Sequence, residues 1–300
     1  MTSDVQRQST GSARRLAAWL DHHARVRLGL LLAGPVGWLV VAYLGSLAVL
    51  FVNSLWTRDA FTGLVIRELT PDNFIDMVTN PLYRNVTLRT VGMAIVVTVT
   101  CAVIAFPIAY FMARVASPWV RGLLTVAVLM PLWASYLVKA YTWRLILSND
   151  GVLNWLLAPL GLRGPGLGES VVGLWLVFTY LWLPYMILPL YAGLERIPAS
   201  LLEASSDLGG KGWTTFRRVI FPLVVPALVA GSIFTFSLTL GDYIVPTIVG
   251  NSRLMIGQAV YTLQGTAGNV PLAAAFTVVP MVIMGIYLYV AKRMGAFDVL

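Results

Sequence analysis

Six long runs of apolar residues, separated by polar segments, dominate the pattern along this chain. Each run is at least as long as the about 20 residues that an α-helix needs to cross the hydrocarbon of a bilayer. The runs cover residues 28–53, 87–114, 121–146, 171–194, 223–246 and 271–293. The pattern therefore predicts an all-α membrane protein with six transmembrane helices.

Prolines lie within or at the edges of these runs. They are Pro35, Pro107, Pro131, Pro184, Pro189, Pro226, Pro246 and Pro280. In water so many prolines would argue against helices, but neighbouring helices in a membrane bundle compensate for the hydrogen bonds that a proline removes. We therefore expect kinked helices around a pathway.

The composition supports a membrane protein. Hydrophobic residues make up 58% of the 300 residues and charged residues only 11%, whereas soluble domains have about 25% charged residues. The net charge of +8 indicates basic residues that set the orientation in the membrane and attract anionic lipid, and it does not indicate nucleic-acid binding. The single cysteine, Cys101, excludes an intrachain disulfide. The adjacent His22 and His23 do not form the cluster that a metal site needs.

The distribution of lysine and arginine predicts the orientation. Numbering the connections between the six runs from the N-terminus, 13 of the 21 lysines and arginines lie in the two termini and in the second and fourth connections. The other eight lie in the odd-numbered connections and at the outer ends of the spans. Because cytoplasmic segments carry the excess of these residues, both termini are expected in the cytoplasm. Residues 1–27 then form a cytoplasmic tail, residues 28–300 the transmembrane domain, and residues 201–222 a cytoplasmic connection.

That connection, LLEASSDLGGKGWTTFRRVIFP, is polar and contains several glycines. Ser200 followed by Glu203 predicts a capping box at the start of a short helix over about 201–208. Gly209 and Gly210 are expected to end this helix, because glycine adopts positive φ without penalty.

A second short helix is expected after the glycines. Trp213, Phe216 and Ile220 would share one face of it. Arg217 and Arg218 would lie near its C-terminal end, where the helix dipole favours cations, and Pro222 would close it.

Two other kinds of segment could have a polar sequence with several glycines. A phosphate-binding loop needs glycine where Ser205 stands and serine or threonine where Gly212 stands, so the GGK triplet does not match it. An amphipathic hairpin that lies on the membrane without a partner stays possible.

The connection resembles the EAA loop of permease subunits of ABC importers. The residues that match this pattern in register are Glu203, Ala204, Gly209, Phe216, Val219 and Pro222. Ser205, Gly210 and Phe221 depart from it conservatively. The resemblance continues through LTPDNFIDMVTNPLYRNVTLRT, MPLWASYLVKAYTWRLILSNDGVLN and TLGDYIVPTIVG, and it covers nearly the whole chain after residue 27. These segments look like the spermidine/putrescine branch of the family.

The resemblance implies a type I ABC-importer permease fold with a cytoplasmic coupling helix within about 199–222, in a bacterial inner membrane. Implied partners are a dimer of cytoplasmic ATP-binding subunits, a second permease subunit that is a distinct homologue, and an extracytoplasmic substrate-binding protein. ATP and Mg²⁺ would bind the partner ATPase, so this chain would be no enzyme and would bind no cofactor. Coupling to the ATPase would involve Glu203, Ala204, Ser205, Asp207, Gly209, Phe216, Arg217 and Pro222.

Polar and aromatic residues at the outer ends of the third, fourth and fifth spans predict the substrate pathway. The candidates are Asp242, Tyr243, Tyr141, Trp143, Tyr180 and Tyr185. An acid placed within a span is by default functional, and a carboxylate beside aromatic faces suits a polyamine. Equally, Asp242 could pair with Lys139 or Arg144, or cap a break in span five near Pro246.

The cargo stays open. Lys139 and Arg144 argue mildly against a purely cationic pathway, so an opine or amino-acid derivative is an alternative, as are thiamine, iron or phosphonates. A membrane-embedded enzyme is disfavoured because the spans contain no histidine and the chain has neither HExxH nor GxSxG. A simple channel would not explain the coupling loop.

Overall fold

The computed structural model describes residues 23–59, 61–161, 166–250 and 254–294. The chain divides into two compact units, residues 1–53 and 54–300. Most of the expected cytoplasmic tail, together with His22, lies outside the described residues, as do Arg163 and Arg253.

The first unit is a long helical stretch. It consists of α2 (Ala24–Trp38), a π-helical segment η1 (Leu39–Leu44) and α3 (Gly45–Ser54), whose last residue opens the second unit. The stretch has a mean hydropathy of 2.1 over its most apolar window, so the helix expected over 28–53 is confirmed.

The second unit begins with a small outer segment. A two-stranded antiparallel sheet pairs β1 (Thr57–Arg58) with β2 (Val65–Ile66), and α4 (Asp72–Thr79) follows. The Asn73 amide donates to the Ser54 and Trp56 carbonyls, at 2.9 and 2.7 Å. In the turn between the strands, hydrogen bonds lower the pKa of the Asp59 carboxyl. The Thr62 amide has the largest effect, and the Thr62 hydroxyl and the Phe61 amide also donate to this carboxylate.

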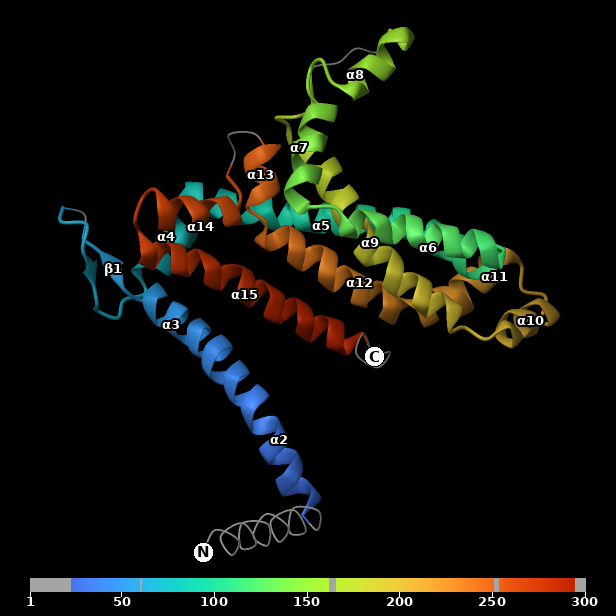
Figure 1. The fold of residues 1–300 in the computed structure, drawn as a ribbon, viewed down its shortest axis with the longest axis horizontal. Helices are drawn as coiled ribbons and strands as arrows, with labels where there is room; N and C mark the ends of the chain where they lie inside the picture. The colour runs from blue at the N-terminus through green and yellow to red at the C-terminus, as the bar shows by residue number, and fades with distance from the viewer. Residues whose placement is uncertain (1–22, 60, 162–165, 251–253, 295–300) are drawn as a thin grey trace, which may run out of the picture. The chain divides into compact units, whose positions relative to one another are not determined.

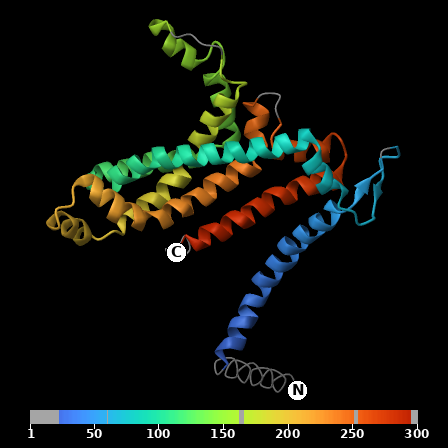
Figure 2. The same ribbon diagram turned by 180° about the vertical axis from the view of Figure 1, so that it is seen from behind.

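Three long helices form the core of this unit. They are α5 (Pro81–Tyr110), which continues into the π turn η2 (Phe111–Val115), α9 (Val171–Glu195) and α12 (Phe221–Gly241). They lie side by side in both views (Figures 1 and 2). α15 (Val270–Arg293) packs on α12 and on α14 (Ile256–Gly265). Side chains that are buried almost completely between the core helices include Val97, Cys101, Phe178, Met186 and Leu190.

The third apolar run does not form one helix, as the pattern over 121–146 predicted. It forms α6 (Pro118–Trp133) and α7 (Tyr136–Ile146), which meet at 97°. Pro131 lacks the amide that would bond to the carbonyl four residues earlier, Ala134 is extended, and Ser135 is non-helical with φ −55° and ψ 132°. Lys139 Nζ donates to the freed Pro131 carbonyl at 2.9 Å. If this bent pair is one crossing, the described residues hold six crossings.

The boundaries of the fifth run also differ from the expectation. The helix expected over 223–246 ends at Gly241, and the short helix α13 (Ile244–Ile248) follows after Asp242 and Tyr243. At its other end, α12 continues without a break from α11 (Gly212–Thr215) through the π turn η4 (Phe216–Ile220). Pro222 therefore does not close a helix: it lies within this continuous helix, directly after the wider π turn. The outer arm after α7 contains α8 (Val152–Leu157) and the 3₁₀ turn η3 (Ala158–Leu160).

Close contact between α9 and α12 depends on small residues. A Cβ added at Gly193 would lie 2.4 Å from the Ala227 Cβ, so Gly193→Ala should force the two helices apart. We expect the free energy of unfolding to fall by about 1–3 kcal/mol, as for other overpacked cores. Thermal unfolding of the detergent-solubilised protein measures this. Gly92→Ala in α5 is the control, because its Cβ would meet nothing within 4 Å; equal melting temperatures for the two variants would contradict the packing argument.

Candidate functional site

The polar connection after α9 starts with α10 (Ala199–Asp207), within two residues of the helix expected over 201–208. The expected capping box is wrong. Pro198 is the N-cap residue, no side chain caps the helix, and Ser200 lies inside its first turn. The fixed φ of Pro198, −61°, with ψ 138°, lets the helix begin directly after it, two residues earlier than the serine cap would require.

Glycine ends α10, as expected. Gly209 has φ +74°, which only glycine adopts at little cost. The Gly210 amide donates to the Ser205 carbonyl at 2.8 Å, and a Cβ at Gly210 would lie 2.6 Å from that oxygen. Across the turn, the hydroxyls of Ser205 and Thr215 are hydrogen-bonded at 2.8 Å. The serine at this position of the pattern therefore joins α10 to α11.

Phe216 anchors the segment to the bundle. Its ring meets Phe106 of α5 edge to face at 5.4 Å between centroids, and it stacks on Trp213 at 5.3 Å. Arg217 and Arg218 are exposed on η4, in the middle of a continuous helix. Their expected place at a helix C-terminus is wrong, because the helix does not stop at Pro222 but runs on into α12.

The outer surface of α10 and the turn after it is uncovered. Glu203, Ala204 and Asp207 are exposed. Leu208 is 89% exposed and Trp213 71% exposed. Large apolar side chains exposed beside acidic ones are typical of a surface that another protein covers. This surface lies at one end of α12, and Asp242 lies at the other, about 30 Å away for a helix of this length.

Asp242 caps the break between α12 and α13. Its Oδ1 accepts from the amides of Ile244 and Val245, at 2.8 and 3.2 Å, and its Oδ2 accepts from the Tyr136 hydroxyl. Of the two structural roles expected from the sequence, an ion pair and a cap, the cap is the one present. Neither of the two basic residues pairs with Asp242. Lys139 donates to the Pro131 carbonyl, and Arg144 Nη2 lies 3.6 Å from Glu169 Oε1.

A hollow of about 530 Å³ lies beside Asp242. Its lining consists of Tyr136, Trp182, Tyr185, Ser237, Leu238, Gly241, Asp242, Tyr243 and Ile244. Trp182 stacks on Tyr136 and meets Tyr185 edge to face, at 5.9 Å between centroids in both pairs. The hollow thus combines one carboxylate with aromatic rings from α7, from α9 and from the break between α12 and α13.

The expected pathway residues divide between three places. Asp242, Tyr243 and Tyr185 line the hollow. Tyr180 and Trp143 instead pack on each other at 5.2 Å in the helical core, and Tyr141 is 55% exposed and does not line the hollow.

Sequence reasoning missed Tyr136 and Trp182, which line the hollow. Tyr136 directly follows the α6–α7 break, a position that the sequence WASY could have indicated. Trp182 lies in the middle of an apolar run and carries no such signal. Its indole nitrogen is buried without a hydrogen-bond partner in the part of the chain that the structure describes.

Metal ligands do not gather in this region. Within the described ranges, no group of three or more histidine, cysteine, aspartate or glutamate side chains could hold a metal ion.

Comparisons with known proteins identify the family of this chain. Residues 105–296 match the family described as "Binding-protein-dependent transport system inner membrane component". The chain is 46% identical to the inner membrane ABC transporter permease protein YdcU of Escherichia coli K12, over 99% of this chain and 98% of that one. It is 33% identical to the spermidine/putrescine transport system permease protein PotB of the same organism, over 86% and 94%.

Solved structures show the same fold. A subunit of a bacterial alginate ABC transporter, solved in complex with an alginate pentasaccharide-bound periplasmic protein, aligns with a TM-score of 0.75 over 94% of this chain and 98% of that one, at 15% identity. A chain of the methionine transporter MetNI in an inward-facing conformation aligns with a TM-score of 0.53 over 73% of this chain and 96% of that one, at 18% identity. With the family match and the apolar helices, these findings show that the chain belongs to the inner membrane components of binding-protein-dependent transport systems: it is a multi-pass ABC-importer permease of the bacterial inner membrane.

Proposed function

We propose that this permease forms one half of the pathway of a polyamine importer, and that ATP is hydrolysed on a partner subunit to which α10 docks. The observation that carries the docking is the exposed surface of α10, where Glu203 and Asp207 are exposed and Leu208, at the end of the helix, is almost fully exposed. An acidic and apolar surface of this kind suits a cleft that offers a basic residue within an apolar wall.

Four residues of the coupling segment, residues 199–222, have a role in this proposal. Glu203 makes the electrostatic contact, Ala204 lets the docked helix approach closely, and Gly209 sets the direction of the turn. Phe216 ties the segment to α5 through its contact with Phe106. Closure of the ATPase dimer would then move the spans as rigid bodies, as in alternating access.

The hollow beside Asp242 suits a polyamine. A carboxylate pairs with an ammonium group, and aromatic rings attract cations through their faces. In the sequence, Lys139 and Arg144 were the reason to consider an anionic cargo. In the structure, both bind other groups and neither lines the hollow. The relative named as a spermidine/putrescine permease supports the same cargo class.

The proposal includes three partners and no cofactor on this chain. A second, distinct permease subunit would complete the pathway, an extracytoplasmic binding protein would deliver the cargo, and a cytoplasmic ATPase dimer would bind ATP and Mg²⁺. The family description itself names dependence on a binding protein.

Transport by the reconstituted complex tests the proposal. The permease, co-purified with its ATPase, second permease subunit and binding protein, is placed in proteoliposomes that contain ATP and Mg²⁺. We expect accumulation of radiolabelled spermidine or putrescine that stops without ATP and that excess thiamine or an amino-acid derivative does not compete away. Accumulation of one of those competitors in place of the polyamines would overturn the cargo and leave the importer; hydrolysis by this chain alone would overturn the division of labour.

A further inference from the structure

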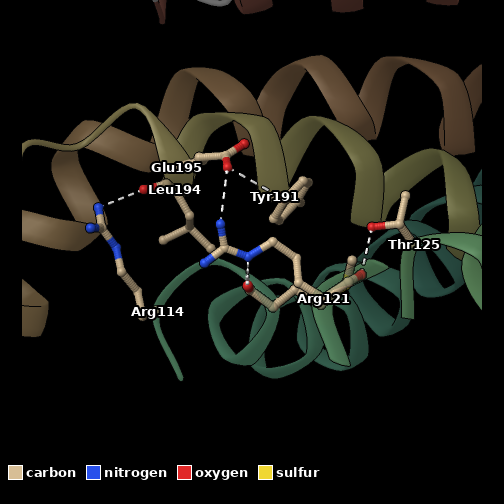
Figure 3. A network of polar contacts seen from close by, with 7 residues as sticks. Arg114, Arg121, Thr125, Tyr191, Leu194 and Glu195 are labelled. Atoms are coloured by element: carbon tan, nitrogen blue, oxygen red, sulfur yellow. Dashed lines mark hydrogen bonds and ion pairs between the residues drawn. The ribbon is translucent and has the colours of Figure 1, made fainter. Parts of the chain in front are cut away.

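Two arginines, one in η2 and one at the start of α6, bind the end of α9, directly before the coupling segment. Arg114, in η2, donates from Nη2 to the carbonyl oxygens of both Leu194 and Ile197, at 2.6 Å each. Figure 3 shows this side chain reaching from one connection to the end of α9. The two carbonyls lie on either side of the turn in which α9 ends.

Arg121, in the first turn of α6, makes the second link. Its Nε donates to the Met112 carbonyl of η2 at 3.1 Å, and its Nη1 lies 3.5 Å from Glu195 Oε1. The Tyr191 hydroxyl also donates to that carboxylate, at 3.2 Å (Figure 3). The end of α9 is thus joined to both helices of the neighbouring connection.

The position of these links gives them a consequence for coupling. Only residues 196–198 separate the end of α9 from the start of α10. Leu194 and Ile197 are buried, so their carbonyls depend on protein partners, and hydrogen bonds from a charged donor are stronger than neutral ones. A three-residue linker whose central carbonyl is bound to η2, next to the bound end of α9, cannot act as a free hinge.

We propose that Arg114 and Arg121 are positioning residues that make the start of α10 move together with the inner ends of α5 and α6. This inference rests on the proposed docking of α10 to an ATPase. A force on α10 would then reach three helices at once: α9 through the chain, and α5 and α6 through the arginines. Without the arginines, α10 and the end of α9 could move while the other two helices stay behind.

A distance measurement in the complete importer tests this. Spin labels at Ser206→Cys in α10 and Trp119→Cys in α6, both exposed sites, report whether the two elements move as one body. In the parent chain we expect the distance to stay the same when ATP is added. In Arg114→Met, which keeps the apolar stem but has no donor, we expect the distribution to shift or broaden with ATP, and uptake per ATP hydrolysed to fall about tenfold.

Further variants separate positioning from simple stability. Arg114→Lys keeps a charged donor and should restore part of the coupling. Arg293→Met is the matched control, because Arg293 contacts only Tyr289, four residues earlier in its own helix, in the part of the chain described. If Arg114→Met fails to assemble, Arg121→Met removes the weaker link and should broaden the same distance to a smaller extent.

The outcomes distinguish this inference from the proposed function. An ATP-independent distance and normal coupling in Arg114→Met, beside loss of coupling in Glu203→Lys, would overturn the arginine links and leave the docking of α10 intact. Normal coupling in Glu203→Lys would overturn both. Equal loss in Arg114→Met, Arg114→Lys and Arg293→Met would also overturn the inference, since the effect would not follow the hydrogen bonds.

Discussion

Replacement of Glu203 by lysine is expected to abolish the stimulation of ATP hydrolysis by loaded binding protein and to reduce uptake at least about thirtyfold, the effect of losing about 2 kcal/mol from a desolvated charge pair at an interface. The side chain is exposed on α10 and has no partner within the described residues, so the permease itself should fold as before. Reversal of its charge would set two cations against each other in the proposed cleft. ATPase and uptake assays on the same proteoliposomes measure both quantities.

Two companion variants make this test specific. Glu203→Gln removes the charge without adding repulsion, and its effect should be smaller. Asp76→Lys makes the same change of charge at an exposed site on α4, in the outer segment, and should leave stimulation unchanged. If Glu203→Lys retains normal stimulated hydrolysis, α10 does not dock through this carboxylate.

Replacement of Asp242 by asparagine is expected to lower the uptake of spermidine or putrescine about tenfold or more, while basal ATP hydrolysis persists. The physical reason is the loss of a charge-assisted contact with the cargo. Asparagine is nearly as good a capping residue as aspartate, so the Ile244 and Val245 amides keep their acceptor and the break before α13 keeps its geometry. Uptake as a function of cargo concentration measures the effect.

The controls separate charge from architecture. Asp242→Ala removes the cap as well as the charge and should also reduce the amount of folded protein. Asp150→Asn changes an exposed acid in the outer connection, outside the hollow, and should transport normally. Uptake kinetics of Asp242→Asn equal to those of the parent chain would mean that Asp242 serves only as a cap.

Much of the fold follows from the apolar pattern, because helices of about 20 residues are almost the only structures that satisfy the backbone within a bilayer. The ends of the elements follow less well. The break between Trp133 and Tyr136 and the end of α12 at Gly241 depend on how freed carbonyls and amides find partners, such as Lys139 and Asp242. Such long-range partners are not visible in the local pattern.

The coupling segment and the hollow likewise differ in how far the sequence predicts them. The coupling segment is contiguous in sequence, so its register with the family pattern is enough to predict its residues and its short helix, while their roles stay predictions. The expected serine cap is absent because the helix begins directly after Pro198. The hollow is assembled from residues more than a hundred positions apart, such as Tyr136 and Asp242. A tyrosine or tryptophan in an apolar run is equally typical of a core, so Trp182 could be identified only once the helices were placed.

The π turns at the inner ends of α5 and α12 have a consequence for how chains of this family can change in length. In η4 the Phe221 amide bonds to the Phe216 carbonyl, five residues back, so the turn holds one residue more than an α-helical turn. Deletion of a single residue between 216 and 220 would convert it to regular helix and leave the apolar span of α12 complete. Because the wide turn takes up the extra residue locally, α10 and α11 would keep nearly the same direction about the axis of α12. Chains that differ by one residue at this turn could therefore still present α10 on the same side of the bundle.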